Sequence, residues 1–408
     1  MNADDHNEVE QMLTSRLAAV AAAGALSLTA ACTAADAGSS TSTGPVKIGV
    51  VVPVTGFLSP LGLGDKAAVE QEVKAINDAG GVLGRKLEVT IKDDKSDVPQ
   101  SVTEFNQLAA DKSYSAILSS SFVSASTAVG PRAKTAKIPI VALGPVSAFA
   151  DGSNPYAFTG VAVPEVYARA MVDYLAAQKV SSLAIGYTGK DLYGETGNKA
   201  TVAAAKEAGI DVVLDEPYDQ TATDFSALVS KVKAAKPAAF LVWGAGPAPV
   251  IISKQFAGSG IPLLMTGAQA SQLYVKPAGA AAEGVVMTSS IAVPGRELPA
   301  GPLKDLVDAF TGPWAKTNAG YPPQFAFDGA TGVQLLKAAI EEAGSTDRAK
   351  VRDALESLDV LTPTGRFTFS KTDHAGLDTD AVAIVKVENG DLKTTPYSLQ
   401  RFSTNLPK

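Results

Sequence analysis

The stretch Val46-Lys-Ile-Gly-Val-Val-Val52 predicts a buried parallel strand, because it is short, almost wholly apolar and ends in three consecutive valines. An amphipathic stretch from Lys66 to Ala79 follows it, with apolar residues close to the helical period. Gly80-Gly81 then offers the positive φ of a helix C-cap. A second strand, Leu87–Lys92, comes next. This strand, helix, strand order indicates an α/β fold with a parallel sheet.

The alternation continues to about residue 143 and then starts again. The first series continues with helices over Pro99–Ala110 and from about Ser126, and with strands over Ser115–Ser119 and Ile138–Leu143. The second series alternates the helices Glu165–Gln178, Gly194–Ala208, Thr223–Ala235 and Ala248–Gly258 with the strands Ser182–Tyr187, Val212–Leu214, Ala238–Trp243 and Leu263–Met265. We therefore expect two doubly wound parallel-sheet lobes with a ligand cleft between them, beyond the carboxyl ends of the strands.

The C-terminal region is less regular. Three further helices are predicted, over Leu303–Lys316, Gly329–Glu342 and Lys350–Leu358. Two β-rich stretches, Gly365–Ser370 and Ala381–Val387, are expected to pair as a terminal hairpin.

The N-terminal region has the layout of an export signal. An apolar run from Leu17 to Leu28 is followed by Thr29-Ala-Ala-Cys32, which holds the only cysteine of the 408 residues, and then by small polar residues up to Gly44. This order is typical of an exported protein that is cleaved before a cysteine and lipidated there. The alternative is a lone buried cysteine in an Ala-rich helix.

We accordingly expect a signal peptide over residues 1–31, a tether over 32–45, and a lipid anchor on Cys32 that holds the protein at the outer face of the cell membrane. Residues 1–11 are acidic, which is the wrong charge for the start of a signal peptide. Translation from Met12 would give a better start than translation from Met1.

Composition argues against several classes of function. The net charge is -7 and no block of Lys or Arg stands out, so nucleic-acid binding is not expected. No apolar run after Leu28 is long enough to span a bilayer. A lipidated Cys32 leaves no thiol for catalysis or metal binding, and of the two histidines only His374 lies outside the leader. His374 sits in a turn sequence and is expected to be an exposed loop residue, so we expect no enzyme, no metal and no cofactor.

Loops at the strand ends are the better candidates for a site. Ser119–Thr127 would place hydroxyls and backbone N–H groups at a helix N-terminus, where carboxylates bind; an ordinary N-cap is the alternative. Leu143–Ser147 is a second such loop. Gly62-x-Gly64 is interpreted as loop flexibility near the cleft. Asp93-Asp94 is interpreted as a solvated loop that caps the next helix, rather than a cation site.

Several short motifs together resemble the periplasmic branched-chain amino-acid binding proteins, the solute receptors of ABC importers. They occur in the family's order over nearly the whole mature chain: Ile48–Gly56, Ala75–Arg85, Lys92–Asp94, Asp191-Leu-Tyr-Gly194, Thr223–Leu228, Ala281–Gly284 and Gly344–Asp347.

The resemblance implies the type I fold, whose two lobes are joined by three crossovers. These are expected near Thr159–Val163, Ser289–Val293 and Thr362–Gly365. Lobe 1 would comprise residues 46–160 and 292–361, and lobe 2 residues 161–291 and 362–408.

The resemblance also implies the ligand contacts. Ser124 would hold a carboxylate, the loop of Pro145, Val146 and Ser147 would add hydroxyl and backbone contacts, and Tyr193 would contribute from the second lobe. The remaining wall positions are Leu61, Phe122, Val123, Trp243 and Ala245.

Gln269 stands where amino-acid binders carry the acidic residue that holds the ligand's ammonium. An amide brings no compensating charge, and a buried unpaired ammonium is costly. We therefore rank a small carboxylate without an ammonium first, such as an aromatic or branched acid, then a branched-chain amino acid, then a small amide. An acid elsewhere, such as Asp219, could still supply the charge.

The expected function is a monomeric, lipid-anchored solute-binding protein that delivers its ligand to the permease and ATPase of an ABC importer. The alternative is the ligand-sensing receptor component of a signalling system on the same fold. A hydrolase would need a general base that the sequence does not offer.

Overall fold

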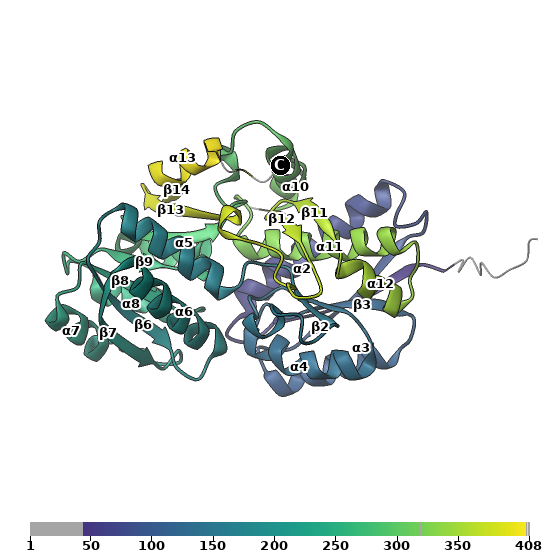
Figure 1. Cartoon of the computed structure of the whole chain (residues 1–408), viewed down its shortest axis with the longest axis horizontal. Coiled ribbons are helices and arrows are strands. Elements are labelled where there is room, and N and C mark those ends of the chain that lie inside the picture. Colours follow the sequence, from purple (N-terminus) through teal and green to yellow (C-terminus); the bar gives the residue numbers. More distant parts are fainter. Residues whose placement is uncertain (1–43, 319, 405, 407–408) are drawn as a thin grey trace, which may run out of the picture. The chain divides into compact units, whose positions relative to one another are not determined.

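The computed structural model describes residues 44–318, 320–404 and 406 (Figure 1). From Pro45 onward the chain forms one compact unit. The predicted signal peptide, the tether up to residue 43 and Cys32 lie outside the described residues. Within the described part, no helix is both long enough and apolar enough to cross a membrane.

The first lobe is built on a five-stranded, wholly parallel sheet in the order β2-β1-β3-β4-β5. Its strands are β1 (Val46–Val52), β2 (Leu87–Asp93), β3 (Tyr114–Ser119), β4 (Ile140–Ala142) and β5 (Ala157–Thr159). The connecting helices are α2 (Ser59–Asp78), α3 (Val98–Ala110) and α4 (Val123–Ala136). Burial of β1, β3 and β4 on both faces explains why their sequences are continuous apolar runs.

The second lobe is built on a seven-stranded sheet in the order β14-β13-β10-β9-β8-β6-β7. Five strands are parallel: β6 (Ser182–Thr188), β7 (Asp211–Tyr218), β8 (Ala239–Trp243), β9 (Leu263–Met265) and β10 (Val286–Ser290). Antiparallel pairing adds β13 (Val382–Glu388) and β14 (Asp391–Thr394) at the β10 edge. The helices are α5 (Pro164–Ala177), α6 (Leu192–Ala208), α7 (Ser226–Ala235), α8 (Ala248–Phe256), α9 (Gln272–Ala278) and α13 (Pro396–Thr404).

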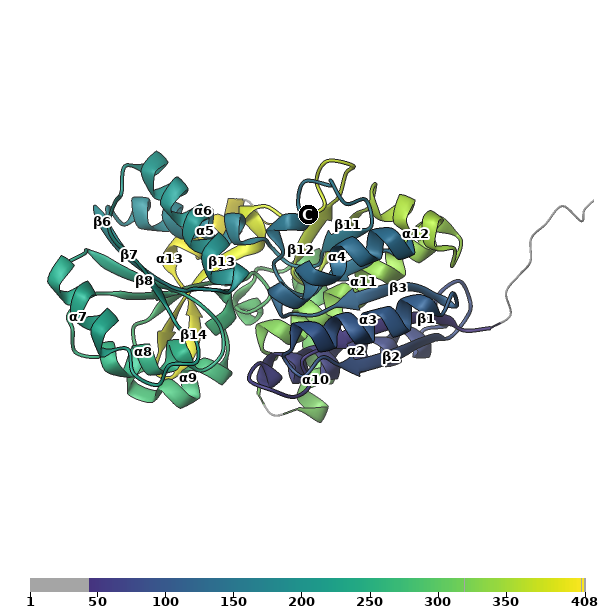
Figure 2. The same ribbon diagram turned by 90° about the horizontal axis from the view of Figure 1, so that it is seen from below.

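A C-terminal segment returns to the first lobe. Helix α10 (Pro302–Thr317) leads to α11 (Gln324–Ala343), which packs along α2 and against β3 and β4 (Figure 2). Helix α12 (Arg348–Leu355) and a two-stranded hairpin of β11 (Asp359–Thr362) and β12 (Gly365–Thr368) follow. The chain therefore passes between the two sheets three times.

The first two passages follow β5, which ends at Thr159, and β10, which ends at Ser290. The third expected crossover, Thr362–Gly365, forms the turn of the β11–β12 hairpin, and the chain rejoins the seven-stranded sheet only at Val382. The expected pairing of Gly365–Ser370 with Ala381–Val387 is wrong. Each stretch has another partner, because β12 pairs with β11, whereas β13 pairs with β10 and β14.

The loop interpretation of Gly62 and Gly64 is also wrong, because α2 already begins at Ser59 and contains both residues. The helix approaches the end of β1 so closely that a Cβ on Gly62 would lie 2.2 Å from the carbonyl oxygen of Pro53. Gly62 is thus required by close packing and not by flexibility.

Asp94 is not in a solvated loop. It is fully buried and accepts hydrogen bonds from the Ser120 hydroxyl (2.6 Å) and the Ser96 backbone N–H (2.9 Å). The helix that follows is capped by Asp97, whose carboxylate accepts from the backbone N–H of Gln100.

His374 is not an exposed loop residue either. Its ring is 0% exposed, stacks on Phe158 with 4.0 Å between ring centroids, and places Nδ1 2.8 Å from the carbonyl oxygen of Ala157. The local turn sequence is real, but the loop folds back onto β5 and covers the histidine.

Candidate functional site

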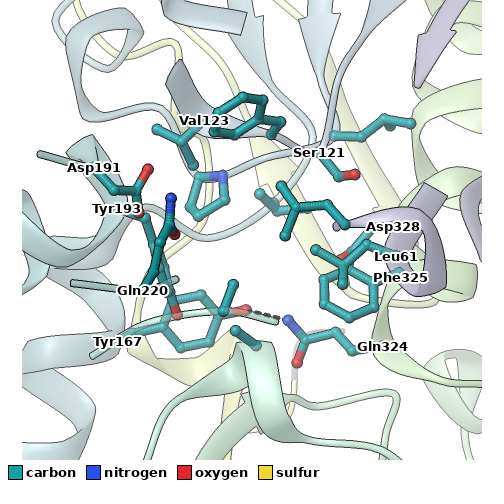
Figure 3. A pocket seen from close by; sticks show the side chains of 17 residues that line it. Leu61, Ser121, Val123, Tyr167, Asp191, Tyr193, Gln220, Gln324, Phe325 and Asp328 are labelled. Atoms are coloured by element: carbon teal, nitrogen blue, oxygen red, sulfur yellow. Dashed lines mark hydrogen bonds between the residues drawn. The ribbon is translucent and has the colours of Figure 1, made fainter. Parts of the chain in front are cut away.

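A cavity of about 590 Å³, including space open to solvent, lies where loops that follow strands of both sheets meet (Figure 3). We call it the central cavity. Its walls come from loops that follow strands of both sheets, from the first turns of helices α2, α4 and α6, and from helices α5 and α11. The lining residues are Leu58, Leu61, Ser121, Phe122, Val123, Leu143, Pro145, Val161, Tyr167, Asp191, Tyr193, Gln220, Ala245, Ala268, Gln324, Phe325 and Asp328.

This location follows from the topology. The carboxyl ends of parallel strands point to one edge of each sheet, and their loops there converge on one space. Of the residues expected at the site, six line the cavity: Leu61, Phe122, Val123, Pro145, Tyr193 and Ala245. The other five, Ser124, Val146, Ser147, Trp243 and Gln269, lie outside its lining.

The two serines expected to hold a carboxylate make other bonds. Ser124 lies in the first turn of α4, and its hydroxyl donates to Oδ1 of Asp191 at 3.3 Å. Ser147 donates to the Glu165 carboxylate at 2.8 Å. Val146 is buried beside it. The Ser120 hydroxyl donates to Asp94 at 2.6 Å and the Ser126 hydroxyl donates to the carbonyl oxygen of Ser120 at 2.6 Å, so neither is free for a ligand.

Tyr193 is held from both sides. Its hydroxyl shares a 2.7 Å hydrogen bond with that of Thr266, and its ring stands edge-on to Trp243 at 5.3 Å between centroids. Trp243 is fully buried behind it, and its indole N–H donates to Thr201 at 2.9 Å. Trp243 therefore supports the cavity wall from the core and does not form its surface.

Gln269 faces a neighbouring groove. Its amide donates to the carbonyl oxygen of Gly244 at 2.8 Å, which fixes the side chain within the second lobe. Two other amides line the central cavity, Gln220 in the loop after β7 and Gln324 in α11. Asp219, which precedes Gln220 and is the acid considered as a substitute, instead accepts from the backbone N–H and hydroxyl of Thr221.

The carboxylate of the second-lobe wall is Asp191, which we did not expect there (Figure 3). It is largely buried, and this burial raises its pKa, whereas the backbone of Gly194 and the hydroxyls of Thr188 and Ser124 lower it. The sequence carried a signal for it, since Asp191 opens the motif Asp191-Leu-Tyr-Gly194. Because Asp191 directly precedes α6, the sequence alone suggests a helix N-cap and gives no reason to place the residue in a cavity.

Helix α11 supplies polar groups that the sequence reading also missed. The Gln324 amide donates to the Tyr167 hydroxyl at 3.1 Å and its oxygen accepts the backbone N–H of Ser290 at 2.8 Å. Asp328 lies one turn further along the helix and also lines the cavity. The described lining contains no Lys, Arg or His. An apolar cavity of this kind, with carboxyl and amide groups at set points, suits a small molecule that donates hydrogen bonds or carries a positive charge.

Comparison with known proteins defines the class. The family model described as periplasmic binding protein matches residues 45–391, and the chain belongs to that family. It is an exported solute-binding protein with the type I fold, and its homologues are substrate-binding proteins and not enzymes. Members of the family bind small ligands and work with ABC transporter components.

Among curated relatives, the chain is 27% identical over 353 residues to Leu/Ile/Val-binding protein homolog 3 of Brucella melitensis, which covers 85% of this chain and 92% of that protein. It is 26% identical over 363 residues to the leucine-, isoleucine-, valine-, threonine-, and alanine-binding protein of Pseudomonas aeruginosa, with 88% and 90% covered.

Solved structures show the same fold. An extracellular ligand-binding receptor from Rhodopseudomonas palustris HaA2 superposes with a TM-score of 0.79 at 23% identity, covering 86% of this chain and 99% of that one. The branched-chain amino acid transporter substrate binding protein LivJ of Streptococcus pneumoniae, in complex with isoleucine, gives 0.75 at 20% identity over the same shares.

Proposed function

We propose that this protein captures a small neutral amino acid for an ABC importer, tethered to the membrane by a lipid on Cys32. The observation that carries the ligand class is Asp191 in the cavity wall beside Tyr193. A buried carboxylate of this kind is the partner that a ligand ammonium needs, and the described lining offers no cation that would favour a purely anionic ligand.

This proposal reverses the ranking made from the sequence. That ranking placed an acid without an ammonium first, because Gln269 was taken as the replacement for the family's acidic residue. With Asp191 in the cavity and Gln269 bonded to Gly244, the reason for that preference no longer holds. The names of two relatives, a Leu/Ile/Val-binding protein homolog and a leucine-, isoleucine-, valine-, threonine-, and alanine-binding protein, support the same choice.

In the proposed complex the ligand ammonium binds Asp191. The ligand carboxylate accepts from backbone N–H groups at the start of α4 and from the Ser124 hydroxyl, which exchanges its 3.3 Å hydrogen bond to Asp191 for one to the ligand. A helix N-terminus with orphan N–H groups favours an anion there. In the loop after β4 we assign the contact to Pro145, since the Ser147 hydroxyl is occupied by Glu165. Leu61, Phe122 and Ala245 would cover the apolar part of the ligand.

The lobes would close over the ligand because the ligand binds the closed form more tightly than the open form. We propose lobe 1 as residues 46–160 with 292–361 and lobe 2 as 161–291 with 362–408, except that the last boundary moves to the stretch between β12 and β13, because the β11–β12 hairpin is continuous across residue 361. The closed, liganded monomer would then dock on its permease.

Calorimetric titration of the purified protein with leucine, its keto acid 4-methyl-2-oxopentanoate and 4-methylpentanamide tests the proposal. We expect leucine to bind most tightly, and Asp191→Asn to weaken leucine binding by about tenfold or more. Asp219→Asn is the matched control, because Asp219 is exposed and outside the cavity, and should leave affinity unchanged. Tighter binding of the keto acid than of leucine would restore the ranking drawn from the sequence.

A further inference from the structure

A second carboxyl group, that of Asp328 on α11, lines the central cavity. None of the hydrogen bonds described around the cavity involves it. Its side chain is only 3% exposed, and no hydrogen bond to it is formed within residues 44–318, 320–404 and 406. Figure 3 shows Asp328 and Asp191 on opposite sides of the cavity. The proposed ammonium site at Asp191 therefore does not account for Asp328.

Among the described residues, none that surrounds Asp328 forms a hydrogen bond with it, so a partner would have to approach from the cavity. Behind Asp328 lies Asp65 of α2, which is 0% exposed. Helices α2 and α11 are in backbone contact here, since a Cβ on Gly329 would lie 2.7 Å from the carbonyl oxygen of Asp65. Burial raises the pKa of both carboxyl groups, and the charge of Asp65 raises that of Asp328 further. Asp65 does not reach the cavity, whereas Asp328 does.

A third polar group, the Ser121 hydroxyl, supports the same conclusion. The hydroxyl of Ser121 lines the same wall of the cavity; it lies beside the Asp65 carboxyl but forms no hydrogen bond of normal geometry with any described residue. The neighbouring polar group, Gln324, is by contrast already bonded to Tyr167 and Ser290. Leaving a buried polar group unpaired costs about 1–3 kcal/mol, and more when it is charged. A donor on a ligand would remove that cost.

We propose that Asp328 and Ser121 form a second polar subsite of the cavity, which takes a hydrogen-bond donor at the end of the ligand remote from Asp191. The inference rests on the proposed function, in which Asp191 holds the ammonium of an amino acid. The preferred ligand is then an amino acid whose side chain ends in a donor, such as a hydroxyl or an amide, rather than a purely aliphatic one. The apolar residues between the two carboxyl groups cover the atoms that join the two ends.

Isosteric pairs of ligands test this directly. Threonine and valine have the same shape, as do asparagine and leucine, and each pair differs by the donor at the side-chain end. Calorimetric titration of the wild-type protein should show the polar member of at least one pair bound about tenfold or more tightly. Asp328→Leu should abolish that ratio and leave the affinity for the aliphatic member within a few-fold. Asp328→Asn, a smaller change, should reduce the ratio if the leucine variant does not fold.

Asp219→Asn is the matched control, because Asp219 is exposed and outside the cavity lining, and it should retain the wild-type ratio. Aliphatic members that bind as tightly as their polar isosteres, or a ratio unchanged by Asp328→Leu, would overturn the second subsite. If leucine binding still depended on Asp191, the proposed function would survive that result. If none of the four amino acids bound, the proposed function would fail, and the second subsite with it.

Discussion

The hydroxyl of Ser124, in the first turn of α4, donates a hydrogen bond to the carboxylate of Asp191, which precedes α6 in the other lobe. The 3.3 Å contact joins loops that follow β3 and β6, strands of different sheets. Thr188 donates to the second oxygen of the same carboxylate at 3.3 Å. Asp191 is thus oriented by one hydroxyl from each lobe, and both bonds are long enough to be exchanged for a ligand donor.

Ser124→Ala should weaken binding of the cognate amino acid by about tenfold, because it removes a donor near the ligand carboxylate and one of the two hydroxyls that orient Asp191. Ser147→Ala is the matched control, since that hydroxyl is bonded to Glu165 outside the cavity lining, and should change affinity less than twofold. Calorimetric titration of both variants with the amino acid shows which of the two serines contributes to ligand affinity. A larger loss in Ser147→Ala would place the ligand head on the loop after β4.

Gly197→Ala should destabilise the protein by about 1–3 kcal/mol. A Cβ there would lie 2.2 Å from the ring of Trp243, and the indole cannot retreat because it is fully buried and bonded to Thr201. Gly312→Ala is the control: Gly312 is also within a helix, but a Cβ would have open space, so the change should stabilise by about 0.5–1 kcal/mol. Urea unfolding measures both, and equal effects would refute the close contact.

Asp65→Asn should raise the free energy of unfolding at neutral pH, by about 1–3 kcal/mol. Burial raises the pKa of Asp65 above its ordinary value of 3.8, so above that pH the unfolded chain releases a proton that the folded chain retains. This difference lowers wild-type stability as pH rises, and the advantage of asparagine should therefore grow with pH.

Urea unfolding at pH 5 and pH 8 checks that trend. Asp78→Asn, at the exposed end of the same helix, should have little effect at either pH. A variant less stable than the wild type at pH 8 would mean that the Asp65 carboxylate is paired in solution.

His374 should make the protein sensitive to mild acid. Burial lowers its pKa below the ordinary value of 6.5, so that below that pH the unfolded chain takes up a proton which the folded chain refuses, and stability falls. His374→Asn keeps a donor near Ala157 but loses the stacking on Phe158. It should be less stable at pH 8, yet lose less stability between pH 7 and pH 5. Parallel pH profiles for the two proteins would contradict this assignment.

Local pattern was sufficient for most of the fold. Val46–Val52 is a strand with the predicted bounds, and the alternation of strands and helices up to Met265 is confirmed, since a continuous apolar run and a 3.6-residue period are properties of neighbouring residues. The predicted pairing of the terminal strands was wrong because strand pairing depends on residues that are distant in the chain. Val382–Glu388 has the composition of a strand, but nothing within it specifies that its partners are β10 and β14 instead of β12.

The family, the parallel two-lobe fold and the strand-end position of the site were thus determined by the sequence by itself, because they depend on periodicity and on motifs that are continuous in the chain. Tertiary structure alone decided which polar side chains face the cavity. Asp191 looks like a helix cap, Asp328 is one polar residue in a helical pattern, and Gln269 looks like a contact although it is bonded to Gly244. Whether a side chain meets a ligand or the core is decided by helices and loops brought together from distant parts of the chain, such as α11 against α2, and no local pattern encodes that packing.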